Sequence, residues 1–280
     1  MKYKIPKSGS VGGKLRRIAA SEISQARDAL SRTASNGMAI ESVHKARRHI
    51  KKMRGLLRLA RPGLGRKKFE RENIFFRDAG REIRAARDGV PLIEALDGLS
   101  RRSFNGETPA IVKRLRRLLV LDARKLARAI KSDGTIARTT EHLAEKRDEV
   151  KRWKLKDLTP KAARQAWQKA LKAARRAFEV AYVEPTEENL HEFRKKAKNL
   201  LYETLLLRER CPGLQENRSA TQKLTDLLGE DHDLALLAEA AREREGKLRS
   251  PDEFKVLDAL VAARRKRLHI EAFALAKRSL

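Results

Sequence analysis

The sequence predicts an all-α protein, and three observations support this class. Hydrophobic residues make up 41% and charged residues 37% of the 280 residues, a combination typical of long amphipathic helices. Only 15 glycines and 8 prolines interrupt the chain. Between them, apolar side chains recur every three or four positions, which is the spacing of one face of a helix.

The chain contains an internal duplication. The segment VHKARRHIKKMRGLLRLARPGL at 43–64 aligns with LHEFRKKAKNLLYETLLLRERCPGL at 190–214, and both end in Pro-Gly-Leu. The matched cations and histidines are His44 with His191, Arg47 with Arg194, Arg48 with Lys195, and Lys51 with Lys198. Two copies are too few for a solenoid, in which about three or more units stack. We therefore expect one pseudo-twofold globule spanning residues 1–280, with two independent domains as the alternative.

Each copy is expected to form about four helices, and the copies span about 14–131 and 161–277. The elements that match, in chain order, are Lys14 and Arg17 with Lys161 and Arg164 in the helix before each histidine helix, Arg87-Asp88 with His232-Asp233, and the helix near 107–131 with the helix near 252–276. The connector at 132–160 is predicted to form one more helix and a loop.

The first histidine helix carries two separate faces. Its apolar seam consists of Val43, Ala46, Ile50, Met53, Leu57 and Ala60. The adjacent basic arc consists of His44, Arg47, Arg48, Lys51, Arg54 and Arg58. Between residues 42 and 69 there are 11 Lys and Arg but no Asp or Glu. Like charges at this spacing destabilise a helix, so the segregation of charge indicates a binding surface.

The second histidine helix repeats this layout. Its seam consists of Phe193, Ala197, Leu200, Thr204 and Leu207, and its shorter basic arc of His191, Arg194, Lys195 and Lys198. Glu192 and Glu203 are expected to avoid the arc and to lie near the polar back of the helix. The alternative interpretation is that both arcs are ordinary solvated faces surrounded by counterions.

The charge balance indicates an anionic partner. The chain has 66 Lys and Arg against 37 Asp and Glu, a formal net charge of +29. Such an excess destabilises the compact state unless anions relieve it, so nucleic acid, polyphosphate or an anionic membrane surface are the candidate partners. Aromatic residues amount to only 5%, which disfavours proteins that bind single strands by stacking bases.

Other features of the sequence suggest a protein of a reducing compartment. Cys211 is the single cysteine, so an internal disulfide framework and a cysteine-rich zinc site are excluded. Residues 1–13 lack the apolar core of a signal peptide, and the longest apolar runs are too short to span a bilayer. We expect a cytoplasmic protein without membrane contact.

The paired segments VHKARRHIKKMR and LHEFRKKAKN, followed by RAARD and GEDHD, resemble the CHAD family, the conserved histidine α-helical domain. The resemblance implies two four-helix bundles about a pseudo-twofold axis, a basic central cleft or pore, and binding of inorganic polyphosphate. The candidate binding residues, from the resemblance and the two arcs, are His44, Arg47, Arg48, Lys51, Arg54, Arg58, His191, Arg194, Lys195, Lys198, Lys14, Arg17, Lys161 and Arg164. The second copy departs from the first, because it has Asn199 where the first has Lys52, and Leu201, Tyr202 and Leu205 further along the helix. Its basic arc is therefore shorter.

The two motif histidines have two possible roles. Neighbouring cations disfavour a protonated imidazole and bound phosphate favours it, so His44 and His191 are candidate sensors of pH or occupancy. The alternative is that each one only spaces or caps its helix. His49, His142 and His269 are expected to be ordinary surface or packing residues, and His232 to belong to a local ion network rather than to a metal site.

The sequence predicts no enzyme, no cofactor and no metal. The stretch GSVGGKL lacks the spacing of a phosphate-binding loop. Glu243, Glu245 and Lys247 match the E-x-E-x-K pattern of triphosphate tunnel enzymes, but in a predicted helix rather than in the strand that the pattern needs. Weak nucleic-acid binding, or a scaffold that docks on polyphosphate granules, are the alternative functions.

Overall fold

Helices account for nearly all of the secondary structure in the described part of the chain. The computed structural model describes residues 2–35, 39–84, 89–103, 108–155, 158–214, 216–248 and 251–280. Within these ranges the all-α class is confirmed, with eleven α-helices and no strand. The helices are α1 (Val11–Ser35), α2 (Ala39–Leu64), α3 (Arg66–Glu82), α4 (Gly89–Ser103), α5 (Ala110–Ser132), α6 (Thr135–Lys151), α7 (Pro160–Val183), α8 (Glu187–Leu207), α9 (Glu216–Arg242), α10 (Glu245–Leu248) and α11 (Pro251–Ser279).

Side-chain caps explain where α7 and α8, the first two helices of the second copy, begin. The Thr159 side chain accepts a hydrogen bond from the Ala162 amide at 3.1 Å, and Pro160 occupies the first turn of α7. The Thr186 side chain likewise accepts from the Asn189 amide at 3.2 Å at the start of α8. Both helices therefore begin at residues whose side chains replace missing backbone partners.

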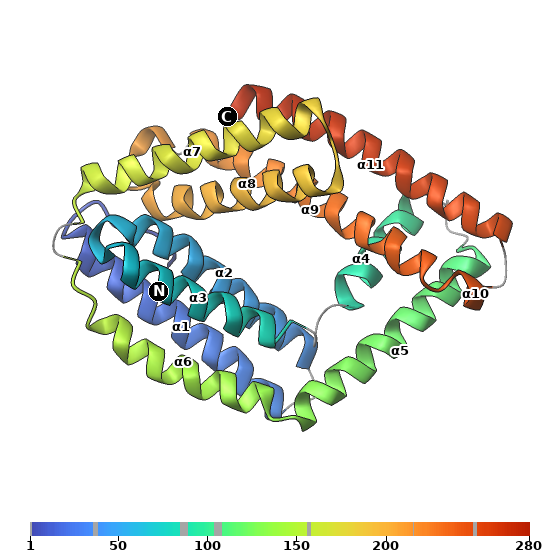
Figure 1. Ribbon diagram of the computed structural model, residues 1–280, viewed down its shortest axis with the longest axis horizontal. Coiled ribbons are helices and arrows are strands. Elements are labelled where there is room, and N and C mark those ends of the chain that lie inside the picture. The colour runs from blue at the N-terminus through green and yellow to red at the C-terminus, as the bar shows by residue number, and fades with distance from the viewer. Residues whose placement is uncertain are drawn as a thin grey trace.

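The helices are arranged in a ring (Figure 1). On one side α1 packs on α2 and α6, and α2 packs on α3. On the opposite side α7 packs on α8, α8 on α9, and α9 on α11. The helices α4 and α5 pack on each other, and α4 also packs on α9, which closes the ring away from the chain termini. The contacts of α2 with α7 and α8 close it at the other end.

Two hydrophobic clusters hold the ring together. The first joins α1, α2, α3 and α6 to the first half of α7 and the last turns of α8. The second joins α8, α9 and α11 to α4 and α5, with Leu96, Leu115, Leu237 and Leu268 all fully buried. Neither cluster is confined to one sequence repeat, because α4 and α5 of the first copy pack against helices of the second. The pseudo-twofold relation between the repeats stays a prediction, and the matched pair Arg87-Asp88 lies outside the described residues.

The two histidine helices meet at a close crossing. A side chain at Gly55 of α2 would place its Cβ 2.5 Å from the Cβ of Tyr202 on α8, far inside normal contact distance. Glycine is therefore required here for the two backbones to approach. Within the described residues, no helix is both long enough and apolar enough to cross a membrane.

Candidate functional site

The apolar seams of both histidine helices are confirmed. In α2 the predicted seam residues are at most 2% exposed, and the same holds for the seam of α8. Packing of these seams fixes the rotation of each helix about its axis and so determines where the adjacent basic arcs point.

Two arginines of the first arc attach α3 to α2. The Arg47 guanidinium donates a hydrogen bond to the Gly80 carbonyl oxygen at 2.6 Å. Arg54 donates through Nε to Oδ1 of Asn73 at 3.1 Å, and burial lowers its pKa. An arginine carries five N–H donors, so these bonds orient the guanidinium groups and leave donors for an anion. Part of the predicted arc thus has a structural role as well.

The second arc meets α9 through a pair of histidines. The rings of His191 on α8 and His232 on α9 lie 4.9 Å apart between centroids. Burial, and then the neighbouring Arg194, lower the pKa of His191, and the same two causes with His191 itself lower the pKa of His232 to about 4. Burial first, and the positive charge of Arg194 second, therefore favour the neutral form of both imidazoles.

Three more cations complete this group. Burial is the main cause that lowers the pKa of both Arg194 and Lys198, and Arg194 lowers that of Lys198 further. Arg84, directly after α3, also lowers the pKa of both histidines. Asp233 and Asp226 of α9 offset only part of this repulsion. The central basic cluster, as it is called below, consists of Arg84, His191, Arg194, Lys198 and His232.

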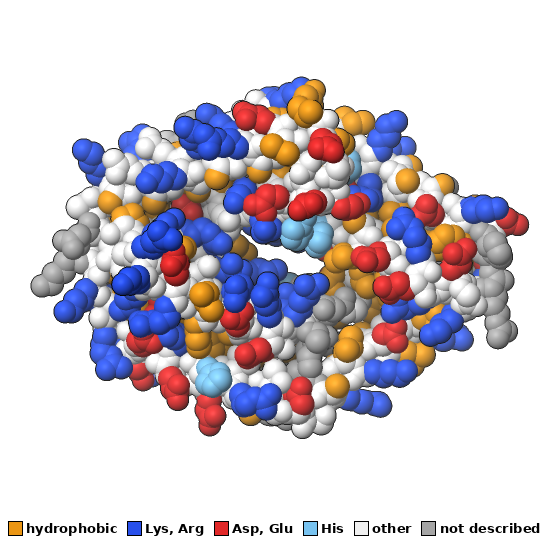
Figure 2. All heavy atoms as spheres, in the orientation of Figure 1, with side chains coloured by type: hydrophobic (Ala, Val, Ile, Leu, Met, Phe, Trp, Pro, Cys, Tyr) orange, Lys and Arg blue, Asp and Glu red, His pale blue; other side chains and the backbone are white. Residues whose placement is uncertain are grey.

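The first histidine helix approaches this cluster at the Gly55 crossing. Burial raises the pKa of Tyr202, and Arg194 and Arg48 both act in the opposite direction, so one cation from each histidine helix acts on the same phenol. Figure 2 shows an opening in the middle of the molecule with Lys and Arg side chains gathered along one edge and a histidine on the other. In Figure 1 the helices around it are α2 and α3 on one side and α8 and α9 on the other.

The expectation that acidic residues avoid the second arc is wrong. Glu192 lies 2.5 Å from the Lys195 ammonium and 2.9 Å from that of Lys196, because residues three and four apart are neighbours on a helix. These bonds lower the pKa of Glu192 to about 2. Lys195 therefore already has an anionic partner on its own helix.

Glu203 was expected on the polar back of α8 and lies in the interior instead. It is 2% exposed, and burial raises its pKa to about 8. The reason is tertiary, since the end of α2 and the N-terminal segment of the chain pack over this turn of α8, with Arg58 nearby.

The cations of the preceding helices lie on the surface. Lys14 is half-buried near the start of α1, and Arg17, Lys161 and Arg164 are exposed. In α2, His44 is half-buried, whereas Arg48 and Lys51 are exposed. A contribution of these residues to anion binding stays a prediction.

Sequence reasoning did not select His232 or Arg84 as site residues. The alignment of His232-Asp233 with Arg87-Asp88 was the available signal, because it placed both segments at equivalent positions of the repeat. His49 is confirmed as a packing residue, being 9% exposed with Nδ1 2.6 Å from a Glu22 carboxylate oxygen. His269 contacts Asp231 at 2.8 Å, within the ion network of α9 and α11.

Comparison with known proteins identifies the family. The family model described as "CHAD domain" matches residues 17–242, well over half of the chain. The crystal structure of the CHAD domain from the plant Ricinus communis is similar with a TM-score of 0.72, at 14% identity, covering 99% of this chain and 94% of that one. At this identity the likeness concerns the fold, and no curated protein matches the chain. The chain belongs to the CHAD domain family.

Proposed function

We propose that the protein binds inorganic polyphosphate at the central basic cluster and does so without catalysing a reaction on it. The observation that carries this proposal is the shared direction of the pKa changes. Burial lowers the pKa of all four groups, His191, His232, Arg194 and Lys198, and Arg194 lowers that of the other three further. The four side chains come from two neighbouring helices at one place. A polyanion at this place would stabilise the charged forms of all four groups together.

The chemistry of the donors suits phosphate. Arginine forms paired hydrogen bonds to phosphate oxygens, lysine acts as a mobile point charge, and neutral imidazoles donate one hydrogen bond each. Polyphosphate is a single narrow strand with about one negative charge per phosphate. A ring of helices around an opening suits such a strand better than a DNA duplex, whose major groove alone is about 12 Å wide.

Competition at physiological salt tests the choice of ligand. At about 150 mM salt, non-specific binding of DNA is weak because counterion release contributes less. We expect polyphosphate to displace labelled DNA from the protein, and DNA to leave bound polyphosphate in place. If DNA displaces polyphosphate instead, the protein is a nucleic-acid binder and the proposal is wrong.

A matched pair of double variants tests the location. Arg194→Gln with Lys198→Gln removes two charges from the cluster, and Lys266→Gln with Arg267→Gln removes two exposed charges from α11. Hydrogen bonds to charged groups contribute about 1.5–3 kcal/mol each, so the first pair should weaken polyphosphate binding at least about tenfold. The second pair should change it less than about twofold. Equal losses would show that net charge alone binds the polymer.

A further inference from the structure

A second hollow lies on the side of α8 that faces α7. It is a groove of about 670 Å³, closed at one end by the last turns of α2 and the first turn of α3. From α8 it is lined by Lys196, Asn199 and Glu203. At 100° per residue these positions are rotated by about 140° from Arg194 and Lys198, so the groove is separate from the central basic cluster.

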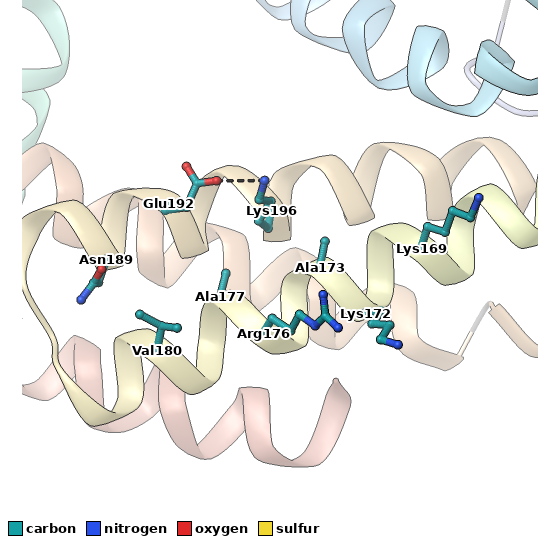
Figure 3. A pocket seen from close by; sticks show the side chains of 9 residues that line it. All are labelled: Lys169, Lys172, Ala173, Arg176, Ala177, Val180, Asn189, Glu192 and Lys196. Atoms are coloured by element: carbon teal, nitrogen blue, oxygen red, sulfur yellow. Dashed lines mark ion pairs between the residues drawn. The ribbon is translucent and has the colours of Figure 1, made fainter. Parts of the chain in front are cut away.

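Small side chains on α7 keep this groove open. Its wall consists of Ala162, Ala166, Ala170 and Ala173, which follow one face of the helix. The groove continues into a neighbouring hollow of about 520 Å³ that shares Lys169, Ala173 and Lys196 with it. In Figure 3, Ala173 and Ala177 point from α7 towards α8, and Lys169 extends from the same helix one turn before Ala173. The groove thus has a smooth, apolar wall and a cationic section.

The floor carries a buried carboxyl group. Glu203 is 2% exposed, and its Oε2 has no hydrogen-bond partner among the described residues. Buried polar atoms are rarely left unmatched, because an unmade hydrogen bond costs about 1–3 kcal/mol. Asn199 lies one helical turn earlier on the same stripe of α8 and lines the same floor. Together these two side chains present both hydrogen-bond donors and acceptors.

Cations surround the mouth of the groove. Arg61, Arg66 and Lys169 are exposed and Lys196 is half-buried. Lys196 is paired with Glu192 and Arg66 with Glu70, each at 2.9 Å. Lys169 forms no ion pair within the described part of the chain. The groove therefore combines an apolar wall, a hydrogen-bonding floor and a positively charged mouth.

We propose that this groove binds a nucleotide, with the edge of the base on Asn199 and Glu203, its face on the alanines of α7, and the phosphates on Lys169 and Lys196. A flat heterocycle matches apolar walls, whereas a bare phosphate chain would leave them without a partner. The volume lies within the range of about 300–1,000 Å³ that is usual for small-molecule pockets. The edge of a base also supplies the donor and acceptor groups that the buried Glu203 carboxyl needs.

Titration with two probes tests whether the base is recognised. ATP and inorganic triphosphate, each without divalent cations, are titrated by calorimetry at about 150 mM salt into the full-length Arg194→Gln, Lys198→Gln variant, in which the proposed polyphosphate site is weakened. We expect one ATP per chain and an affinity at least about tenfold higher for ATP than for triphosphate. Equal affinities, or no saturable binding of ATP, would overturn the proposal, because the groove would then not recognise the base.

Variants separate this site from the polyphosphate site. Ala170→Leu fills the wall, and Lys169→Glu reverses an exposed charge that forms no ion pair among the described residues, so the second variant remains informative if the first fails to fold. Each should weaken ATP binding at least about tenfold and leave polyphosphate affinity within about twofold. Arg194→Gln with Lys198→Gln should weaken polyphosphate binding at least about tenfold and leave ATP affinity within about twofold. If that pair abolishes binding of both ligands, ATP shares the central cluster and the groove is not its site.

Discussion

The pKa of Glu203 leads to a quantitative prediction about stability. Burial raises it from an ordinary 4.5 to about 8, with Arg58 as the charged group that partly opposes this. Below about pH 4.5 the carboxyl is protonated in the folded and unfolded states alike. As the pH rises above 4.5 the unfolded chain ionises while the folded protein keeps its proton, so the free energy of unfolding falls until about pH 8.

The substitution Glu203→Gln removes this effect and keeps the size and hydrogen-bonding groups of the side chain. Each pH unit between the two pKa values corresponds to about 1.4 kcal/mol, so the wild type should lose about 3 to 5 kcal/mol relative to the variant between pH 4.5 and pH 8. Near pH 4.5 to 5 the two proteins should be equally stable within about 1 kcal/mol. At pH 8 the variant should be clearly the more stable.

Urea denaturation followed by circular dichroism at pH 5, 6.5 and 8 measures this difference. The control is Glu70→Gln, which changes an exposed carboxylate paired with Arg66 and should shift stability by less than about 1 kcal/mol at every pH. A stability difference between wild type and Glu203→Gln that is the same at pH 5 and pH 8 would refute the reasoning. So would a variant that is less stable than the wild type at pH 8.

Three further predictions concern packing, a buried charge and ligand binding. Gly55→Ala places a Cβ 2.5 Å from the Cβ of Tyr202. The free energy of unfolding, measured in urea, should therefore fall by about 1–3 kcal/mol. An increase in this free energy would contradict the close crossing. Lys146→Met removes the ammonium group 3.3 Å from the fully buried Glu72 carboxylate. The free energy of unfolding should fall by about 3 kcal/mol, more at pH 8 than at pH 5, because a buried carboxylate loses its partner. An unchanged melting temperature would contradict this prediction. The pKa of His232 is lowered to about 4. Bound polyphosphate should raise this pKa, so that the histidine takes up a proton on binding. Calorimetry should therefore show tighter binding of polyphosphate as the pH falls from 7 to 5. His232→Gln should have a flatter pH profile, and an unchanged profile would exclude this histidine.

The helices and their inner faces could be predicted from the sequence because they depend on short-range order. An apolar seam repeats every three to four residues whatever the helix packs against, and Phe193 or Met53 can be assigned to the interior on this basis alone. The same holds for the position of the basic arcs next to the seams. The resemblance to the CHAD family also depends on local motifs, and the match over residues 17–242 confirms it.

Which side chains meet, and which lose contact with water, depended on the tertiary structure. His232 lies next to His191 only because α9 packs on α8, and no spacing within either helix indicates this contact. Glu203 is charged by type and was placed on the polar back, yet it is buried near Arg58 of α2 and Tyr3 of the N-terminal segment. A periodic pattern describes one helix at a time, whereas desolvation depends on its neighbours. The sequence therefore determined the helices and the excess of basic residues, and only the packing between helices decided where the charges gather and which groove stays open.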